Sequence, residues 1–355
     1  MERYIGLDVH AQTTAFAVLS ASGRQLTAEI IPTSARELID RVQRVKRPRA
    51  VCLEEGNQSA WLSEVLTPYV DQLVVTVPTK RDRSKPKNDV ADAYAVAEQL
   101  RRNAVDTRVF KAPPALAALR SAFTLYARLN EDTVRAKNRL KALFSSRGVS
   151  TAHYGHRLYD PPLEVLEELQ RKLPVAIRFS AEAQLEQISG LEDLRERAAR
   201  ELVSEAKKQT TYRRLLTLPA IGEIRAATLL AVVVTPHRFR ASHQFWSYCG
   251  LGIATVVSSE WAYRGGSRYR QNAPMTRGLK QGNPHLKNVF KGAARTLAAM
   301  NPDEQPLAAH YHCLLQRGLK ENLARVTIAR KLAAITLAVW KNEEDYDPKK
   351  HTRLT

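Results

Sequence analysis

The chain has 355 residues, of which 44% are hydrophobic; this is enough for two or three domains with cores of their own and excludes wholesale disorder. Lysine and arginine outnumber aspartate and glutamate by 55 to 36, and the net charge of +19 points to a polyanionic partner, with nucleic acid ahead of an anionic membrane surface. We expect no membrane span, no signal peptide, and neither a disulfide framework nor a zinc site, because the three widely spaced cysteines are typical of reduced thiols in the cytoplasm.

The chain opens with a pattern typical of a strand that has one buried face. Ile5, Leu7 and Val9 alternate with Gly6 and Asp8, and the apolar run over residues 14–19 predicts a second strand after a short turn. Asp8 would then lie within a central hairpin strand, where a carboxylate is costly unless a cation holds it. From this stretch alone, a metal ligand and a solvated carboxylate without a role both remain open.

The rest of the first 110 residues reads as an α/β domain with a mixed sheet. Further strands are predicted at residues 24–31, 50–56 and 73–77. Helices are predicted after the capping box that begins at Ser34, through residues 61–66, and after Asn88. Three strands followed by alternating helices and strands indicate this fold class.

Carboxylates gather where these predicted elements end. Asp89 and Asp92 lie three residues apart in the first turn of the last helix, where the helix dipole alone would also favour acids. Glu54 and Glu55 end the strand at residues 50–56. With Asp8 they would converge at one end of the sheet, and such a set of carboxylates suits two-metal phosphodiester chemistry.

A basic loop lies between these acids in the sequence. Residues 78–87 include two prolines and a single acid, and we expect an extended segment in contact with nucleic-acid phosphates, the alternative being a solvated charge run. The basic residues are Lys80, Arg81, Arg83, Lys85 and Lys87.

Residues 111–212 predict long antiparallel helices. Apolar residues recur at intervals of mostly three and four, and charges of both signs lie between them. We interpret this segment as a coiled-coil-like spacer and assembly element without chemistry of its own.

Residues 213–340 predict a mainly α domain with two nucleic-acid-binding features, followed by a polar tail at 341–355. A helix-hairpin-helix-like turn around Gly222 would direct backbone amides at a phosphate. Residues 261–301 contain no acid, and a glycine-rich loop within them ends at Asn283, before a predicted helix. The basic residues of this stretch are Arg264, Arg268, Arg270, Arg277, Lys280, Lys287, Lys291 and Arg295, and we expect them to hold nucleic-acid backbones.

These motifs together resemble a known family. The first domain looks like a RuvC-type nuclease of the ribonuclease H-like fold. The runs Ile5-Gly6-Leu7-Asp8, Glu54-Glu55-Gly56 and Asp89-Val90-Ala91-Asp92-Ala93 resemble the DEDD transposases of bacterial insertion sequences. The runs Leu218–Gly222, Tyr248–Leu251, Ser258-Ser259 and Gly278–Asn283 are similar in order and spacing to the C-terminal domain of the same family, of the insertion-sequence one-ten type.

The resemblance implies roles for individual residues. Asp8, Glu54, Asp89 and Asp92 would be catalytic ligands of Mg²⁺, as two ions, with Glu55 as the alternative to Glu54. A serine after the Gly-Leu motif is the family's nucleophile and becomes joined to DNA. The matching position is Ser258. Ser259 is the alternative, because the family often has glycine after the serine, whereas Ser259-Glu260 follows Ser258 in this chain.

The resemblance also implies partners. It predicts a bacterial transposase, in the cytoplasm at the nucleoid, that acts on element ends and target DNA with a structured guide RNA. It further implies a homo-oligomer, a dimer or tetramer, in which the carboxylate domain of one protomer meets the serine domain of another.

Three other functions remain open from the sequence. A RuvC-like hydrolytic nuclease or junction resolvase would use water as nucleophile. An actin-like ATPase or sugar kinase shares the opening strand pattern, but the later glycine-rich phosphate loops that such folds need are not evident. A non-catalytic nucleic-acid-binding scaffold would explain the charge alone.

Overall fold

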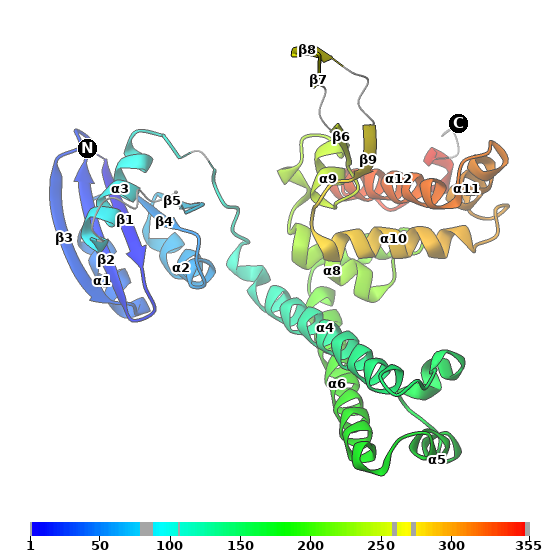
Figure 1. Ribbon diagram of the computed structural model, residues 1–355. Helices are drawn as coiled ribbons and strands as arrows, with labels where there is room; N and C mark the ends of the chain where they lie inside the picture. Colours follow the sequence, from blue (N-terminus) through cyan, green and yellow to red (C-terminus); the bar gives the residue numbers. More distant parts are fainter. Residues whose placement is uncertain (1, 79–87, 106, 258–260, 271–274, 352–355) are drawn as a thin grey trace. The chain divides into compact units, whose positions relative to one another are not determined.

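The computed structural model describes residues 2–78, 88–105, 107–257, 261–270 and 275–351 (Figure 1). These residues form two compact units, residues 1–117 and residues 118–355. The division expected from the sequence, with boundaries at residues 110, 212 and 340, stays a prediction.

The first unit contains one mixed five-stranded sheet. Its strands are β1 (Arg3–Val9), β2 (Thr13–Ser20), β3 (Gln25–Pro32), β4 (Arg49–Glu54) and β5 (Gln72–Thr76). Their order is β3-β2-β1-β4-β5. The first three strands pair antiparallel, whereas β4 pairs parallel with both β1 and β5. The mixed α/β class predicted for this segment is therefore confirmed, and β1 lies at the centre of the sheet.

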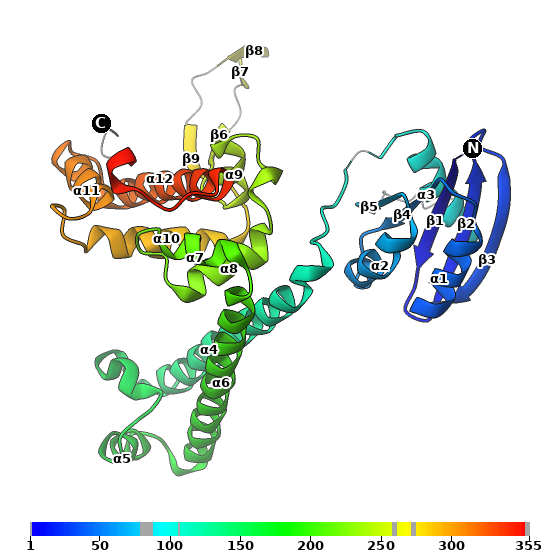
Figure 2. The same cartoon turned by 180° about the vertical axis from the view of Figure 1, so that it is seen from behind.

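Helices cover both faces of this sheet, with α1 (Ala35–Arg44) and α2 (Ser59–Leu66) opposite α3 (Asp89–Arg101) (Figures 1 and 2). Ile5 and Leu7 belong to the apolar core with α1 and α2, while alternate residues of the strands face α3. The predicted helix starts are confirmed. Ser34 accepts a hydrogen bond from the amide of Glu37 at 3.3 Å, and Asn88 accepts two from the first turn of α3.

The second unit begins with two long helices, α4 (Ala117–Ser145) and α6 (Val175–Lys207), joined through α5 (Leu163–Arg171). Apolar residues of all three helices and of the short 3-10 helix Ala152–Leu158 pack into one buried cluster. An ion pair between Lys137 and Glu192 links the two long helices. The predicted helical segment is confirmed, while coiled-coil packing in the strict sense stays a prediction.

The remainder of the second unit is mainly α, as expected from the sequence. It contains α7 (Thr210–Leu216), α8 (Glu223–Val233), α9 (Ser242–Tyr248), α10 (Pro284–Ala298), α11 (Pro306–Gln316) and α12 (Glu321–Asn342). Four short strands form two pairs, β6 (Ile253–Val257) with β9 (Met275–Leu279), and β7 (Trp261–Arg264) with β8 (Ser267–Arg270). None of the described helices combines the length and apolar composition that crossing a membrane requires.

Candidate active site

The contact between β1 and α3 depends on a glycine. A Cβ atom added to Gly6 would lie 1.9 Å from the carbonyl oxygen of Ala93 and 2.7 Å from the amide nitrogen of Ala97. Because Gly6 has no side chain, the backbone of α3 lies directly on the central strand. The first turn of α3, which carries Asp89 and Asp92, therefore lies beside the C-terminal end of β1, where Asp8 is located.

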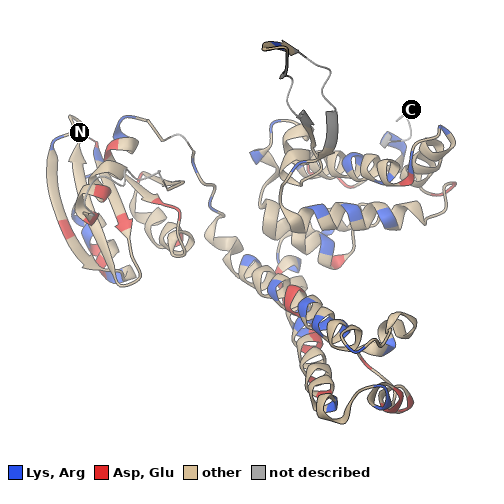
Figure 3. Cartoon of the chain, in the orientation of Figure 1, with Lys and Arg blue, Asp and Glu red and all other residues tan. Residues whose placement is uncertain are grey.

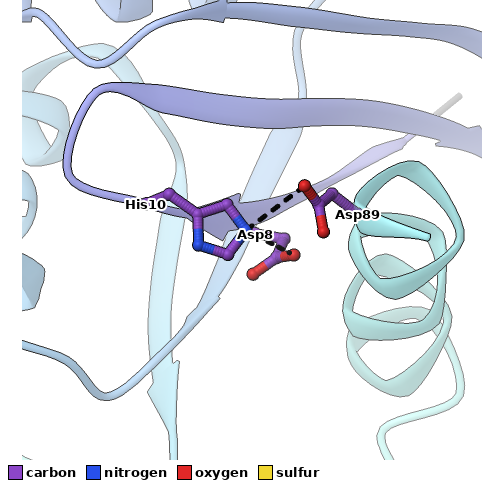
Figure 4. Close-up of side chains that lie close together, drawn as sticks. All are labelled: Asp8, His10 and Asp89. Carbon is purple, nitrogen blue, oxygen red and sulfur yellow. Dashed lines mark ion pairs between the residues drawn. The ribbon is translucent and has the colours of Figure 1, made fainter. Parts of the chain in front are cut away.

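Three side chains converge at this end of the sheet (Figure 4). The Nε2 atom of His10 lies 3.4 Å from an oxygen of Asp8 and 3.4 Å from an oxygen of Asp89. One ligand atom from each residue lies within 4.8 Å of the other two. Two carboxylates and an imidazole in this arrangement have the spacing of ligands around one cation.

The charges that act on Asp8 include those of the three other predicted acids. Burial is the largest cause of a raised pKa at Asp8. The neighbouring His10 lowers this pKa, and the carboxylates of Asp89, Asp92 and Glu54 raise it further. Like charges that repel one another in a partly buried site favour a bound cation. The Nε2 atom of His10 is itself buried and has no hydrogen-bond partner, so the donor set fits a divalent metal ion.

The two adjacent glutamates have different surroundings. Glu54 ends β4 and acts electrostatically on Asp8. Glu55 instead accepts a hydrogen bond from the hydroxyl of Ser59 at 3.1 Å and forms an ion pair with Lys111. Lys111 also donates to the Ser59 hydroxyl at 2.8 Å. Glu55 is thus held by two neighbours of its own, and it is not among the charges that act on Asp8.

His10 was not predicted as a site residue from the sequence. It follows Asp8 by two positions, and in a strand residues two apart share a face. That alternation was the available signal. The turn at residues 10–13 nevertheless reads as a simple hairpin connection, and only the packing of α3 on β1 shows that the imidazole lies between two carboxylates.

In the second unit, two of the sequence motifs meet at a close backbone contact. A Cβ added to Gly282 would lie 2.3 Å from the amide nitrogen of Gly250. Gly250 itself has a φ of +66°, which favours glycine. The amide of Asn283 donates to the carbonyl of Tyr248, and the amide of Lys280 donates to the carbonyl of Gly252, both at 2.8 Å.

The strand β6 starts from this glycine contact. It pairs antiparallel with β9 from Ile253 opposite Leu279 to Val257 opposite Met275. Asn283 caps α10 by accepting hydrogen bonds at 3.1 Å from the amides of His285 and Leu286. The pairing anchors both ends of the segment that contains Ser258 and Ser259, but both serines lie outside the described residues.

Several predicted nucleic-acid-binding residues can be located. Gly222 precedes α8 as its N-cap, in the turn after α7. Arg264 and Arg270 lie in β7 and β8, and Arg277 lies in β9. The guanidinium of Arg268 stacks over the ring of Trp261 at 4.3 Å from the ring centroid.

Two further cations lie at the base of β6. The side chains of Lys280 and Lys287 approach the glycines at positions 252 and 250, respectively. The basic loop residues Lys80, Arg81, Arg83, Lys85 and Lys87 lie outside the described residues.

Comparison with known proteins matches both halves of the chain to one group of proteins. Residues 5–146 match a family model described as a transposase, the DEDD transposase of the IS110 type. Residues 212–311 match the model of the transposase IS116/IS110/IS902 family. The two ranges together cover more than half of the chain. No curated protein sequence matches it.

Proposed function

This chain belongs to the IS110 family of insertion-sequence transposases, and we propose that it breaks and rejoins DNA by the attack of a serine on the phosphodiester. Membership makes it an enzyme that cuts and joins DNA, whereas the serine, the metal and the guide RNA are parts of the proposal. The observation that supports the proposal is the cluster of Asp8, His10 and Asp89 at one end of the sheet, where the charges of Glu54 and Asp92 also act on Asp8.

We assign metal binding to these four carboxylates. Asp8 and Asp89 have ligand atoms within 4.8 Å of each other, and the charges of Glu54 and Asp92 act on Asp8. Glu54 is favoured over Glu55 because the charge of Glu54 acts on Asp8, whereas Glu55 forms an ion pair with Lys111. Two Mg²⁺ ions bound there would stabilise the charge that develops on the scissile phosphate. The protein contributes the orientation of the ligands, since Gly6 allows α3 to lie directly on β1.

We assign the nucleophile to Ser258, with Ser259 as the alternative. Ser258 directly follows β6 in the chain, and β6 is anchored by its pairing with β9 and by the contact between Gly250 and Gly282. Anchored strands at both ends support a segment that presents a side chain to a substrate.

The proposed step conserves the number of phosphodiester bonds. As the serine Oγ bonds to phosphorus, its hydroxyl proton is released, the bond from phosphorus to one sugar oxygen breaks, and that oxygen takes up a proton. The DNA is then joined to the protein through a phosphoserine ester. The reverse attack by a sugar hydroxyl of another strand restores the serine and rejoins the DNA, so strand exchange requires no external energy source.

The partners in this proposal are element ends, target DNA and a structured guide RNA. The net charge of +19 and the basic residues of the second unit support a polyanionic partner. The carboxylates and the serine belong to different units, and we propose that a dimer or tetramer supplies them from different protomers.

Trapping the covalent intermediate tests the mechanism. The chain is expressed with the DNA that flanks its coding region and with a target plasmid, and the cells are lysed in denaturant. We expect a denaturant-resistant protein–DNA adduct that is lost in Ser258→Ala and retained in Ser259→Ala, a matched control one position away. Loss in the Ser259→Ala variant alone would move the nucleophile to Ser259.

The same experiment distinguishes the hydrolytic alternative. DNA cleavage that survives both serine substitutions and still requires Asp8 would indicate a nuclease or junction resolvase that uses water. Activity that survives Asp8→Asn would contradict the carboxylate site. Deleting the flanking non-coding DNA tests the guide RNA, because target joining should then be lost while the protein is still produced.

A further inference from the structure

The second unit contains a cavity of about 540 Å³ between α10 and α12, and two of its lining residues, Lys291 and Arg295, end the basic stretch described above. Its lining is strongly basic. Lys291 and Arg295 come from α10 and Arg325 from α12, together with the side chains of Asn288 and Asn322. No acid lines it, and among the described lining residues Val326 alone has an apolar side chain and none is aromatic.

The spacing of the cations along α10 explains why they gather on one side. Lys287, Lys291 and Arg295 follow one another at intervals of four residues, so they form a stripe along one face of the helix. Figure 3 shows basic residues recurring along α10. Like charges at this spacing repel one another, and a bound anion relieves that repulsion.

The charges within this cavity are poorly neutralised by the protein. Within the described ranges, neither Lys291 nor Arg295 forms an ion pair with an acid. Arg325 is paired with Glu321 through its Nη2 atom, yet its Nε is buried without a hydrogen-bond partner. Lys291, Arg295 and the Nε atom of Arg325 therefore have hydrogen-bond donors available for an anionic ligand.

A further arginine, Arg225 on α8, lies next to Gly292 of the cavity lining. A Cβ added to Gly292 would lie 3.0 Å from the Nη2 atom of Arg225 on α8, so this glycine leaves room for the guanidinium. Nη1 of Arg225 donates to the carbonyl of Ala220 at 2.6 Å. In the described part of the chain no acid pairs with Arg225, and its charge adds to the positive potential of the cavity.

We propose that this cavity binds a phosphodiester of a nucleic-acid backbone, outside the DNA-cleaving site. Cations and amides without an aromatic platform suit phosphate and sugar contacts, whereas bases are held by stacking. The ligand is the backbone itself, of duplex DNA or of a folded RNA. This inference rests on the proposed function, because it takes nucleic acid as the substrate.

The test measures how salt weakens binding to two labelled probes of arbitrary sequence, a 30-base-pair DNA duplex and an RNA hairpin. In the double variant Lys291→Gln/Arg295→Gln, we expect the slope of log affinity against log salt concentration to become shallower by about 1 for the probe that occupies the cavity, because one phosphate is no longer neutralised. The probe that shows this change identifies the source of the backbone. Arg325→Gln alone should reduce the slope by about 1.

The matched control is Arg36→Gln/Lys46→Gln. It removes the same two residue types from exposed positions in the first unit, where neither forms an ion pair with an acid in the described part of the chain, and its slopes should equal those of the wild type. Thermal unfolding at low salt checks folding, and the cavity variant should melt no lower than the wild type because like charges are removed. Equal slopes in the cavity variant and the control, for both probes, would overturn the proposal.

The outcomes separate this inference from the proposed function. Wild-type protein that binds neither probe at low salt would contradict both. Binding with equal slopes in the two double variants, together with a DNA adduct that still depends on Ser258, would leave the proposed function standing and refute the cavity alone. An equal loss of affinity of the cavity variant for polyglutamate and for both nucleic acids would also refute the inference, because the cavity would then be a general anion-binding surface.

Discussion

Replacing Gly6 with alanine should separate α3 from the central strand. The added Cβ would lie 1.9 Å from the carbonyl oxygen of Ala93, whereas ordinary van der Waals contact begins at 3.4 Å, so the helix must move by about 1.5 Å. The colliding atoms belong to the backbone of α3 and cannot rotate away. Overpacking of this kind costs roughly 1–3 kcal/mol, and the upper end of that range applies here because a whole helix is displaced.

The same movement should displace Asp89 and Asp92 from Asp8. A misplacement of about 1 Å can reduce catalysis on the order of 10²-fold. Urea unfolding measures the first effect, and Mn²⁺ titration with adduct formation measures the second. Gly56→Ala is the control, since its Cβ would meet nothing within 4 Å. If Gly6→Ala unfolds within about 0.5 kcal/mol of the wild type and binds metal equally well, the argument from close packing is wrong.

Four other changes have defined outcomes. Asn88→Ala removes the cap of α3 and should cost about 1 kcal/mol in urea unfolding; no change would contradict a capping role. With metal removed by EDTA, the free energy of unfolding of the wild type should fall relative to that of Asp8→Asn as pH rises above 3.8. The reason is that the pKa of Asp8 is raised in the folded state, so the folded protein binds this proton more tightly than the unfolded chain. Parallel pH curves from urea melts would refute it. Glu54→Gln should weaken Mn²⁺ binding by more than about tenfold in calorimetry, and Glu55→Gln should not; the reverse would identify Glu55 as the ligand. Gly282→Ala, with its Cβ 2.3 Å from the amide nitrogen of Gly250, should cost roughly 1–3 kcal/mol and reduce adduct formation, and wild-type behaviour in both assays would contradict the close contact.

The elements of the first unit could be predicted because their signals are local. Alternation at residues 5–9 and apolar runs in the later strands indicate which face is buried. The helix starts at Ser34 and Asn88 depend on hydrogen bonds that span three residues. A sheet with both antiparallel and parallel pairs could be predicted because the strands are joined first by short turns and then by helices.

The candidate site was predictable only in part. Asp8, Asp89 and Asp92 could be grouped because Asp8 lies in the predicted central strand and the other two lie in the first turn of a predicted helix of the same domain. The choice between Glu54 and Glu55 was open, since neighbouring residues have equal claims until their partners are known. The contacts of Glu55 with Lys111 and Ser59 supply that information. Lys111 is far from Glu55 in the chain, and Ser59 lies across a turn from it.

The sequence by itself determined which residue types are present and at what spacing: four carboxylates at element ends, serines after a Gly-Leu pair, and cations every fourth residue along α10. Only the tertiary structure decided which of them meet. The imidazole of His10 lies between Asp8 and Asp89 because α3 packs on a glycine, and Arg325 faces the stripe of α10 across a cavity. Periodicity is a property of one segment, whereas convergence depends on how segments pack against one another, and no local pattern records that.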